Sequence, residues 1–421
     1  MSLPRYAEYR DSGVPWASEI PSHWIIWPLK RVAGLKSGDG ITSEDIEVEG
    51  DFPVYGGNGV RGFTDRFTHD GDFALIGRQG ALCGNINYAK GRFWASEHAV
   101  VVTPVKQVEM RWLGELLRSM NLNQYSVSAA QPGLSVEMIS NHRIPVPPLV
   151  EQSAIAAFLD RETGKIDALI AEQEKLLTLL AEKRQATISH AVTRGLDPNA
   201  PLKDSGVPWV GKVPAHWTIT RLKFVAIVQT GIAKGKDNQG KETIKVPYLR
   251  VANVQDGHLA LGEVAMIDIE PEQLERYRLQ TGDVLMNEGG DFDKLGRGAI
   301  WNAEIEDCIH QNHVFAVRPH AVSPQWLNQI TGSPYAQFYF MGRSKQSTNL
   351  ASISSTNIME LPVLLPPVEE QASILAFIDD ENARLDALNG SSVQAIALLK
   401  ERRSALIAAS VTGKIDVRDI A

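Results

Sequence analysis

The stretch PPLVEQSAIAAFLDRETGKIDALIAEQEKLLTLLAEKRQATISHAVTRG, residues 147–195, decides the fold of this chain. After its opening proline pair it contains no proline, and apolar residues recur at spacings of three and four over about 40 residues. This periodicity predicts one long amphipathic helix. At roughly 1.5 Å per residue, such a helix spans about 65 Å, which is longer than a small domain is wide.

The same pattern occurs a second time. Pro366-Pro367-Val368-Glu369-Glu370-Gln371 opens another apolar-periodic run, which continues to Val411. Residues 152 and 371 are 219 apart, as are residues 192 and 411, so the two runs align without a gap. A single helix of this kind is usually an ordinary core helix. Two gapless copies, each too long for one domain core, instead favour a paired coiled-coil spacer.

A shorter pattern precedes each long helix. Residues 11–16 read Asp-Ser-Gly-Val-Pro-Trp and residues 21–24 read Pro-Ser-His-Trp, and residues 204–209 and 214–217 repeat them with alanine in place of Ser22. The openings have an offset of 193 (204 − 11), whereas the helices have an offset of 219 (371 − 152), so the second repeat is longer in its middle. The chain is therefore a tandem duplication. We expect four segments, at residues 1–146, 147–197, 198–365 and 366–421.

Each globular unit combines strands and helices. Buried strands are expected at residues 72–76, 99–102, 282–286 and 314–317, and short helices at 112–120 and 325–330. The predicted fold class is α+β: two mixed units joined by two long antiparallel coiled-coil helices, with pseudo-two-fold symmetry from the repeat. The frame is shared but the loops on it differ sharply, which is typical of one scaffold with two specificities.

Composition excludes several classes of protein. No run of about 18 apolar residues occurs, so no membrane span is expected. The first residues lack the pattern of a signal peptide, and two cysteines cannot form a disulfide framework, so we expect a cytoplasmic location. A formal charge of −8 argues against a protein that coats nucleic acid by bulk electrostatics, although it permits local basic faces.

Motifs of catalysis are missing from the sequence. Residues 231–237 lack the spacing and the Ser or Thr of a P-loop, and no Asn-Pro-Pro-Tyr-like run of an amino-methyltransferase occurs. No set of His, Cys and carboxylates has metal-ligand spacing. His98 and His313 recur just before equivalent buried strands, where a packing or turn hydrogen bond is a more common role than catalysis.

The loops contain side chains suited to reading DNA. Arg and Lys match guanine edges, Asn and Gln match adenine, and Ser, Thr and Lys match phosphates, although any one of them alone is usually a solvated surface residue. Residues 343–349 stand out, since they supply many donors and no carboxylate. The expected DNA contacts are Tyr55, Asn58, Arg61, Arg78, Gln79, Gln131, Lys234, Lys236, Arg250, Asn253, Lys294, Arg297, Arg343, Lys345, Gln346 and Asn349.

Together these features resemble the specificity (DNA-recognition, S) subunit of type I restriction–modification systems. The resemblance covers nearly the whole chain, and it rests on the duplicated openings, the Pro-Pro-x-x-Glu-Gln helix starts, residues 55–59, and residues 287–298 ahead of His313. It implies two target-recognition domains and a non-catalytic chain that binds double-stranded DNA. It also implies binding to methyltransferase (modification) subunits, expected to be two, and to restriction/translocase subunits in the full complex.

The resemblance also assigns cofactors and a partner surface. S-adenosylmethionine, ATP and magnesium would belong to the partner subunits, with none bound by this chain. The helix starts would dock the partners, through Glu151, Gln152, Phe158, Leu159, Glu370, Gln371 and Phe377. One departure is Gly390, where a glycine costs roughly 1 kcal/mol of helix propensity and suggests a kink or local break.

Two other classes of function remain as alternatives. A nuclease or methyltransferase requires a catalytic constellation, which the sequence does not show. A coiled-coil scaffold without specific DNA readout would account for the helices, but not for two globular units with different loops.

Overall fold

The computed structural model describes residues 4–80, 82–126, 133–234, 241–290, 295–346 and 351–419. Two compact units divide the chain: unit 1 comprises residues 1–175 and 392–421, and unit 2 comprises residues 176–391. Each unit thus holds one globular part and one half of each long helix. In the described parts of the chain, no helix is both long enough and apolar enough to cross a membrane.

Unit 1 is built on an antiparallel sheet in the order β4 (Ala33–Ser37), β11 (Ala99–Pro104), β8 (Phe73–Gly77) and β9 (Ile86–Ala89). A second sheet has the order β6 (Gly59–Thr64), β5 (Phe52–Gly56), β10 (Arg92–Ala95) and β7 (His69–Asp70), in which β5 and β10 are parallel. Two strand pairs complete it: β1 (Tyr9–Asp11) with β2 (Glu19–Pro21), and β3 (Ile25–Pro28) with β12 (Arg143–Val146). Its short helices are α1 (Met110–Ser119) and α2 (Val136–Asn141), with 3-10 turns at Leu29–Arg31, Ser43–Asp45 and Leu122–Tyr125.

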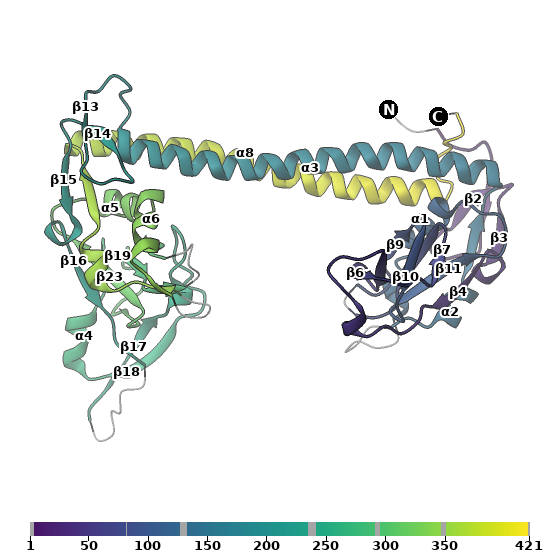
Figure 1. The fold of residues 1–421 in the computed structure, drawn as a ribbon, viewed down its shortest axis with the longest axis horizontal. Coiled ribbons are helices and arrows are strands. Elements are labelled where there is room, and N and C mark those ends of the chain that lie inside the picture. The colour runs from purple at the N-terminus through teal and green to yellow at the C-terminus, as the bar shows by residue number, and fades with distance from the viewer. Residues whose placement is uncertain are drawn as a thin grey trace. The chain divides into compact units, whose positions relative to one another are not determined.

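Unit 2 repeats this plan (Figure 1). Its central sheet has the order β16 (Ala226–Thr230), β23 (Val314–Pro319), β19 (Val284–Asn287) and β21 (Gly298–Ile300). The second sheet is β18 (Ala265–Ile269), β17 (Ile244–Leu249) and β22 (Ile309–His310), with β17 and β22 parallel. The strand pairs are β13 (Leu202–Asp204) with β14 (Lys212–Pro214), and β15 (Thr218–Arg221) with β26 (Pro362–Leu365).

Unit 2 adds a small third sheet in the order β20 (Gly289–Gly290), β25 (Ala351–Ser352) and β24 (Lys345–Gln346). Its short helices are α4 (Pro271–Tyr277), α5 (Pro324–Thr331), α6 (Pro334–Arg343) and α7 (Ser355–Met359), with 3-10 turns at Leu222–Phe224 and Val251–Asn253. The buried strands and short helices expected from the sequence are therefore confirmed. Most of the extra length lies between β17 and β22, because the chain between the paired residues Leu249 and His310 is longer than that between their equivalents Tyr55 and Ala95.

Equivalent glycines show how closely the two frames agree. A Cβ at Gly38 would lie 2.1 Å from the carbonyl oxygen of Ala95, and one at Gly231 would lie 2.0 Å from that of His310. In both units the strand that follows the first motif thus ends where the backbone passes directly against β10 or β22. Only glycine permits this close approach.

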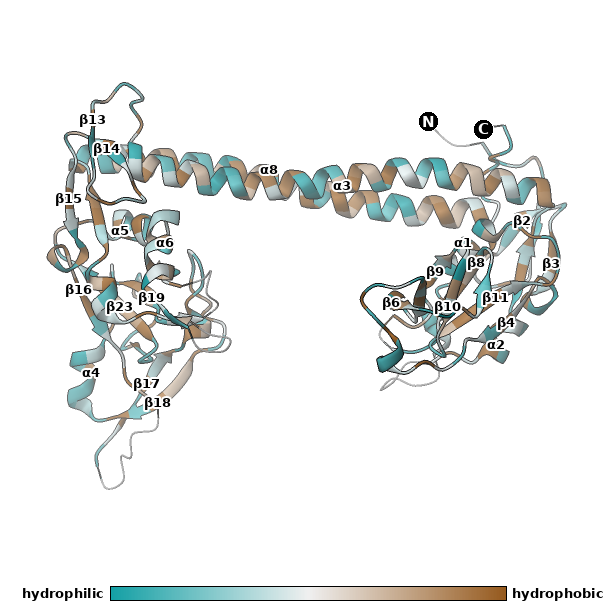
Figure 2. Ribbon diagram, in the orientation of Figure 1, coloured by the Kyte–Doolittle hydropathy of each residue, from teal (hydrophilic) through white to brown (hydrophobic). Residues whose placement is uncertain are grey.

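The two long helices are α3 (Leu149–Arg194) and α8 (Val368–Val411) (Figure 1). Apolar and polar residues are interspersed along both helices (Figure 2). They run antiparallel within each unit. In unit 1, Arg403 donates to Asp167 with an Nε–Oδ1 distance of 2.8 Å, and in unit 2, Arg184 donates to Asp386. These two ion pairs are repeat equivalents, since 167 and 386, like 184 and 403, differ by 219. The predicted local break at Gly390 is wrong, because α8 is helical throughout its length.

Each globular core extends onto both long helices. The unit 1 core includes Phe158 and Leu159 of α3 together with Val411 of α8. The unit 2 core includes Val192 of α3 and Ile378 of α8. Each unit therefore packs on the first turns of one helix and the last turns of the other. This is why the compact units cut through both helices, instead of following the four segments expected from the sequence.

Candidate nucleic-acid interface

Three loops of unit 1 converge where β8 ends. A Cβ on Gly57 would lie 3.4 Å from the carbonyl oxygens of both Gln79 and His98. The side chain of Asn85 donates to the Asn58 side chain at 2.9 Å, which connects the β5–β6 turn to the loop before β9. The β5–β6 turn and the loop that follows β8, which both contain predicted DNA contacts, therefore share one surface.

The predicted contacts on this surface differ in accessibility. Asn58, Arg61 and Gln79 are exposed, and Arg78 is half-buried. Tyr55 is also half-buried, with its ring edge-on to Phe93 at a centroid distance of 5.5 Å.

Burial raises the pKa of the Tyr55 phenol, so its hydroxyl remains a neutral donor. Its ring contributes to the packing under the loops. Gln131 lies outside the residues that the structure describes.

The backbone at Arg78 is held from both sides. Its N–H donates to the carbonyl of His98 at 2.9 Å, and its own carbonyl accepts from the N–H of Leu134 at 3.0 Å. In unit 2 the N–H of Glu288 donates to the carbonyl of His313 at 2.9 Å, and its carbonyl accepts from Ile353 at 2.9 Å. The recurrent histidines thus take part in a turn hydrogen bond through their carbonyls, as expected from the sequence.

In unit 2, Arg250 is exposed at the start of the 3-10 turn Val251–Asn253. Asn253 is only 3% exposed, and its side-chain oxygen accepts from the N–H of Arg250 at 2.9 Å. Its side-chain nitrogen donates to the carbonyls of Ala260 and Glu263. The prediction of Asn253 as a DNA contact is therefore wrong: this amide satisfies buried backbone groups and shapes the loop that carries Arg250.

Arg297, Lys345 and Gln346 are connected to the end of β19. The side chain of Asn287 donates to the carbonyl of Val254 at 2.9 Å, and its N–H donates to the carbonyl of Arg297 at 3.2 Å. Pairing of β20, β25 and β24 attaches Lys345 and Gln346, both exposed, to the residues that follow Glu288.

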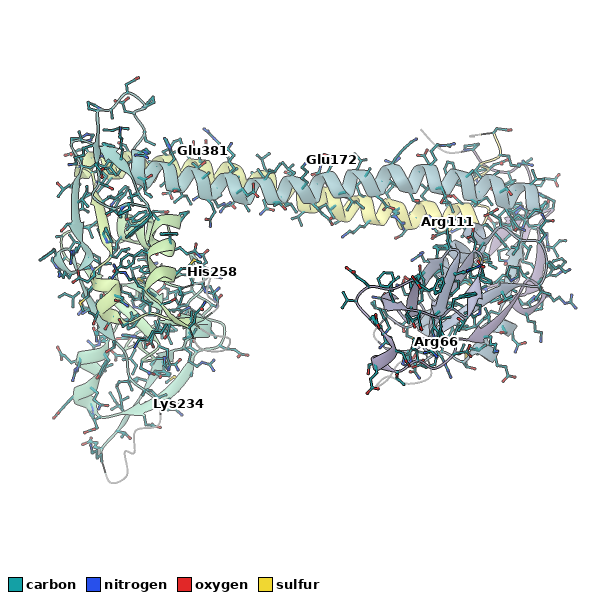
Figure 3. All side chains as sticks on the ribbon, viewed as in Figure 1. Arg66, Arg111, Glu172, Lys234, His258 and Glu381 are labelled. Carbon is teal, nitrogen blue, oxygen red and sulfur yellow. The ribbon has the colours of Figure 1, made fainter. Side chains whose placement is uncertain are left out.

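Lys234 is exposed and lies at the end of unit 2 away from the long helices (Figure 3). Its loop is joined to this region because the N–H of Asn312 donates to the carbonyl of Ile232 at 3.0 Å. Arg343 is exposed and packs over the ring of Tyr339 at 5.3 Å. Lys236, Lys294 and Asn349 lie outside the described residues.

The helix starts do not form the expected partner surface. Glu151 is 6% exposed and accepts from the indole N–H of Trp24 at 2.9 Å and from the hydroxyl of Tyr6 at 3.1 Å, while His23 Nε2 lies 2.6 Å away. Burial, followed by the charge of Glu151, raises the pKa of Tyr6 well above its usual value, so its hydroxyl remains a donor. Gln152 accepts from the N–H of Glu109 and donates to the carbonyl of Pro147.

The equivalent joint in unit 2 has the same chemistry. Glu370 accepts from the indole N–H of Trp217 at 3.0 Å, and His216 Nε2 lies 2.7 Å from its other oxygen. Gln371 donates to the carbonyl of Pro366 at 2.8 Å. The two duplicated motifs of the sequence, the His-Trp openings and the Glu-Gln helix starts, therefore bind one another and attach each globular unit to its helix.

Burial excludes further residues from the predicted partner surface. Phe158 is 3% exposed and Leu159 is fully buried, whereas Phe377 is 38% exposed and stays available. The predicted roles of Glu151, Gln152, Phe158, Leu159 and Gln371 as accessible partner contacts are therefore wrong, and Glu370 is half-buried in its joint.

Sequence reasoning missed an exposed set of leucines in the middle of the helices. Leu169 and Leu388 are each 52% exposed, and Leu179 and Leu398 are 49% and 57% exposed. The two members of each pair are again 219 apart in the numbering, so the exposure itself repeats. A pair of helices buries only one narrow apolar stripe on each helix. The apolar stripe in this sequence is wider than that, and this width was the signal that could have identified the exposed leucines.

Unit 1 also contains a groove of about 830 Å³ between its two helix halves. Phe158, Ile166, Leu169, Leu406 and Ile415 supply its apolar lining. Within the described residues, no group of three or more His, Cys, Asp or Glu side chains is placed to hold a metal ion.

Comparison with known proteins places this architecture. The family model "Type I restriction modification DNA specificity domain" matches residues 21–178. The chain is 42% identical to the EcoprrI specificity subunit of Escherichia coli over 137 residues, which are 32% of this chain and 34% of that protein. It is 25% identical to the EcoKI specificity subunit of E. coli K12 over 324 residues, or 75% of this chain and 68% of that protein. The chain thus spans about a third of the length of the first relative and two thirds of the second.

Solved structures share the fold over nearly the full length. An HsdS subunit from Thermoanaerobacter tengcongensis aligns with a TM-score of 0.52 and 18% identity, covering 94% of this chain and 98% of that chain. A chain solved in work on assembly and conformational transition of the type I R-M system aligns with a TM-score of 0.62 and 19% identity, covering 93% and 98%. Residues 21–178 thus match the DNA specificity domain of type I restriction–modification systems, and the chain as a whole is similar to the specificity subunits of such systems.

Proposed function

We propose that this chain is the DNA sequence-specificity subunit of a type I restriction–modification complex, and that each unit reads one half of a bipartite, asymmetric target. The observation that carries the proposal is the pair of equivalent loop surfaces at the ends of β8 and β19. The hydrogen bonds that hold their backbones are the same, whereas the side chains they present differ. A shared frame with different side chains suits two different half-sites.

The long helices have two roles in this proposal: they set the gap between the half-sites, and they dock two methyltransferase subunits. The repeat-equivalent exposed leucines and the apolar groove of unit 1 support the docking role. Apolar surface of this extent on a helix pair is typical of a protein–protein interface. Two equivalent sets would bind two copies of one partner.

Catalysis belongs to the partners in this proposal. S-adenosylmethionine, ATP and magnesium would be bound by the methyltransferase and restriction subunits, and this chain would act in the cytoplasm as the non-catalytic reader. The relatives described above are specificity subunits, which supports this division of roles.

The test is to reconstitute the chain with its methyltransferase subunit and map methylated adenines in genomic DNA. A bipartite motif that disappears without this chain supports the proposal. A competition shift assay distinguishes this proposal from the alternative of a scaffold without specific readout, because a scaffold would bind cognate and scrambled duplexes equally. Methyl transfer by this chain alone would contradict its assignment as non-catalytic.

A further inference from the structure

We propose that Arg78 and Glu288 are equivalent base-reading residues with opposite preference: Arg78 contacts a guanine in the half-site of unit 1, and Glu288 contacts a cytosine in the half-site of unit 2. This inference rests on the proposed function and adds a residue-level assignment to it. Glu288 was not among the contacts predicted from the sequence, which favoured cations and amides.

Strand register shows that the two positions are equivalent. Gly77, the last residue of β8, pairs with Ala99 of β11, and Asn287, the last residue of β19, pairs with Val314 of β23. Arg78 and Glu288 are the residues that follow. In unit 1, β11 begins directly after His98, whose carbonyl accepts from the N–H of Arg78. In unit 2, β23 begins directly after His313, whose carbonyl accepts from the N–H of Glu288.

The backbone of each residue is fixed before any ligand binds. Its N–H is bonded to the carbonyl of His98 or His313, and its carbonyl to the N–H of Leu134 or Ile353. Residues 134 and 353 are again 219 apart, so the second bond also recurs between the units. A side chain on a backbone held in this way loses little further conformational entropy on binding, which favours precise readout.

Neighbouring contacts keep this position accessible in unit 1. A Cβ on Gly77 would lie 2.2 Å from the carbonyl oxygen of Gly57, so two glycines permit the β5–β6 turn to approach the strand end. Arg78 lies at this junction, where it is half-buried and next to the exposed Gln79.

In unit 2, His313 orients the carboxylate. Its Nδ1 lies 2.6 Å from Glu288 Oε2, and the side chain of Glu288 is 28% exposed. In unit 1 the equivalent His98 contacts the adjacent Glu97 instead, at 3.2 Å, because a guanidinium at position 78 cannot accept its hydrogen bond. The side-chain partner of the histidine thus depends on the charge of the residue at the strand end. This indicates that the residue differs between the units while the backbone around it stays the same.

The chemistry of the two side chains assigns the bases. A guanidinium donates in bidentate fashion to O6 and N7 of guanine, and a carboxylate accepts from the N4 amino group of cytosine. A carboxylate elsewhere on a DNA-binding surface only repels phosphates. The backbone of Glu288 is bonded through both its N–H and its carbonyl, and the loops around it also contain Arg250, Arg297 and Lys345. A carboxylate at this position is explained if it accepts a hydrogen bond from a base.

The experiment uses the complete complex of this chain with its methyltransferase subunit. Arg78→Gln and Glu288→Gln are compared with wild type by methylated-adenine mapping and by competition with duplexes that differ in one base pair. Matched controls are Arg92→Gln, an exposed arginine paired with Asp70, and Glu272→Gln on the surface of α4. Thermal unfolding of each variant checks that the fold is intact.

Arg78→Gln is expected to relax one G·C pair in the unit 1 half-site, with discrimination at that pair reduced on the order of 10- to 100-fold and the other half-site unchanged. Glu288→Gln should relax one C·G pair in the unit 2 half-site in the same way. Arg78→Lys, which keeps the charge but loses the bidentate geometry, gives a second measurement if the glutamine variant is unstable.

Two results would overturn the inference. The first is that Glu288→Gln raises affinity equally for cognate and scrambled duplexes, as expected for lost repulsion alone. The second is that Arg78→Gln weakens binding uniformly with a shallower salt dependence, as expected for a phosphate contact. Neither result affects the proposed function, which is tested separately by whether the wild-type complex methylates a bipartite sequence.

Discussion

Trp24 donates its indole N–H to the carboxylate of Glu151 at 2.9 Å, although the two residues are 127 positions apart in the chain. The repeat equivalents Trp217 and Glu370 form the same bond at 3.0 Å. Two motifs that are far apart in sequence, and that each occur twice, are therefore halves of one joint. The joint fixes the angle at which each globular unit leaves its helix start.

Removing the carboxylate of this joint should destabilise unit 1. Glu151→Ala leaves the buried donors of Trp24 and Tyr6 without an acceptor, and each such group costs about 1–3 kcal/mol. We expect the free energy of unfolding to fall by about 3 kcal/mol, measured by urea unfolding with tryptophan fluorescence. Glu172→Ala is the control, because Glu172 is exposed on the same helix (Figure 3). Equal stability of both variants would show that the joint is not needed.

Exchanging one unit should change one half of the target. If residues 25–146 are replaced by the same region of a relative, the half-site read by unit 1 changes and the other half is retained, since the loops of unit 2 are untouched. Methylated-adenine mapping of the chimera measures this directly. Simultaneous change of both halves would contradict modular readout.

Arg343 at the end of α6 and Lys345 in β24 should bind phosphates. Arg343→Ala or Lys345→Ala is expected to weaken binding to all duplexes, and to reduce the slope of log affinity against log salt by about 0.9 for each phosphate that is no longer neutralised. Lys400→Ala, an exposed residue of α8, should leave the slope unchanged. A slope that neither Arg343→Ala nor Lys345→Ala alters would place these residues outside the interface.

The exposed leucines should bind the partner subunits. Leu169→Lys combined with Leu388→Lys removes repeat-equivalent apolar side chains that are each 52% exposed. Co-purification of the methyltransferase subunit should fall at least tenfold, while the thermal midpoint of the isolated chain changes little, because about half of each side chain is already exposed. The control exchanges two residues that are already polar and exposed, Glu172→Lys and Asp380→Lys. Undiminished co-purification of the leucine variant would assign docking to another surface.

The paired helices should act as a spacer. Inserting four residues after Gln173 and four after Ser392 adds about one turn, or roughly 6 Å, to both helices. The insertions lie between the ion pairs Asp167–Arg403 and Arg184–Asp386, so both pairs can still form. At about 3.4 Å per base pair, the unread gap should lengthen by one or two pairs while both half-sites keep their sequences. An unchanged gap would show that the helices do not set it.

The sequence by itself determined the architecture of this protein. Helix α3 is 46 residues long and α8 is 44, and both follow from an apolar period that is local and needs no knowledge of partners. The duplication is equally a property of the sequence, because one constant offset in the numbering relates the two helices throughout. Buried strands such as β11 were predictable because residues 99–102 form a run of four consecutive apolar residues. All four are buried in the structure.

Only the tertiary structure decided which polar residues face outward. Glu151 and Asn253 have the chemistry of ligand contacts, yet both are buried. Glu151 accepts a hydrogen bond from Trp24, and Asn253 donates to the carbonyls of Ala260 and Glu263. Glu288 was overlooked since its equivalence to Arg78 rests on strand register and on hydrogen bonds to His313 and Ile353. Period and composition are local quantities, whereas the burial of a side chain depends on which distant backbone reaches it.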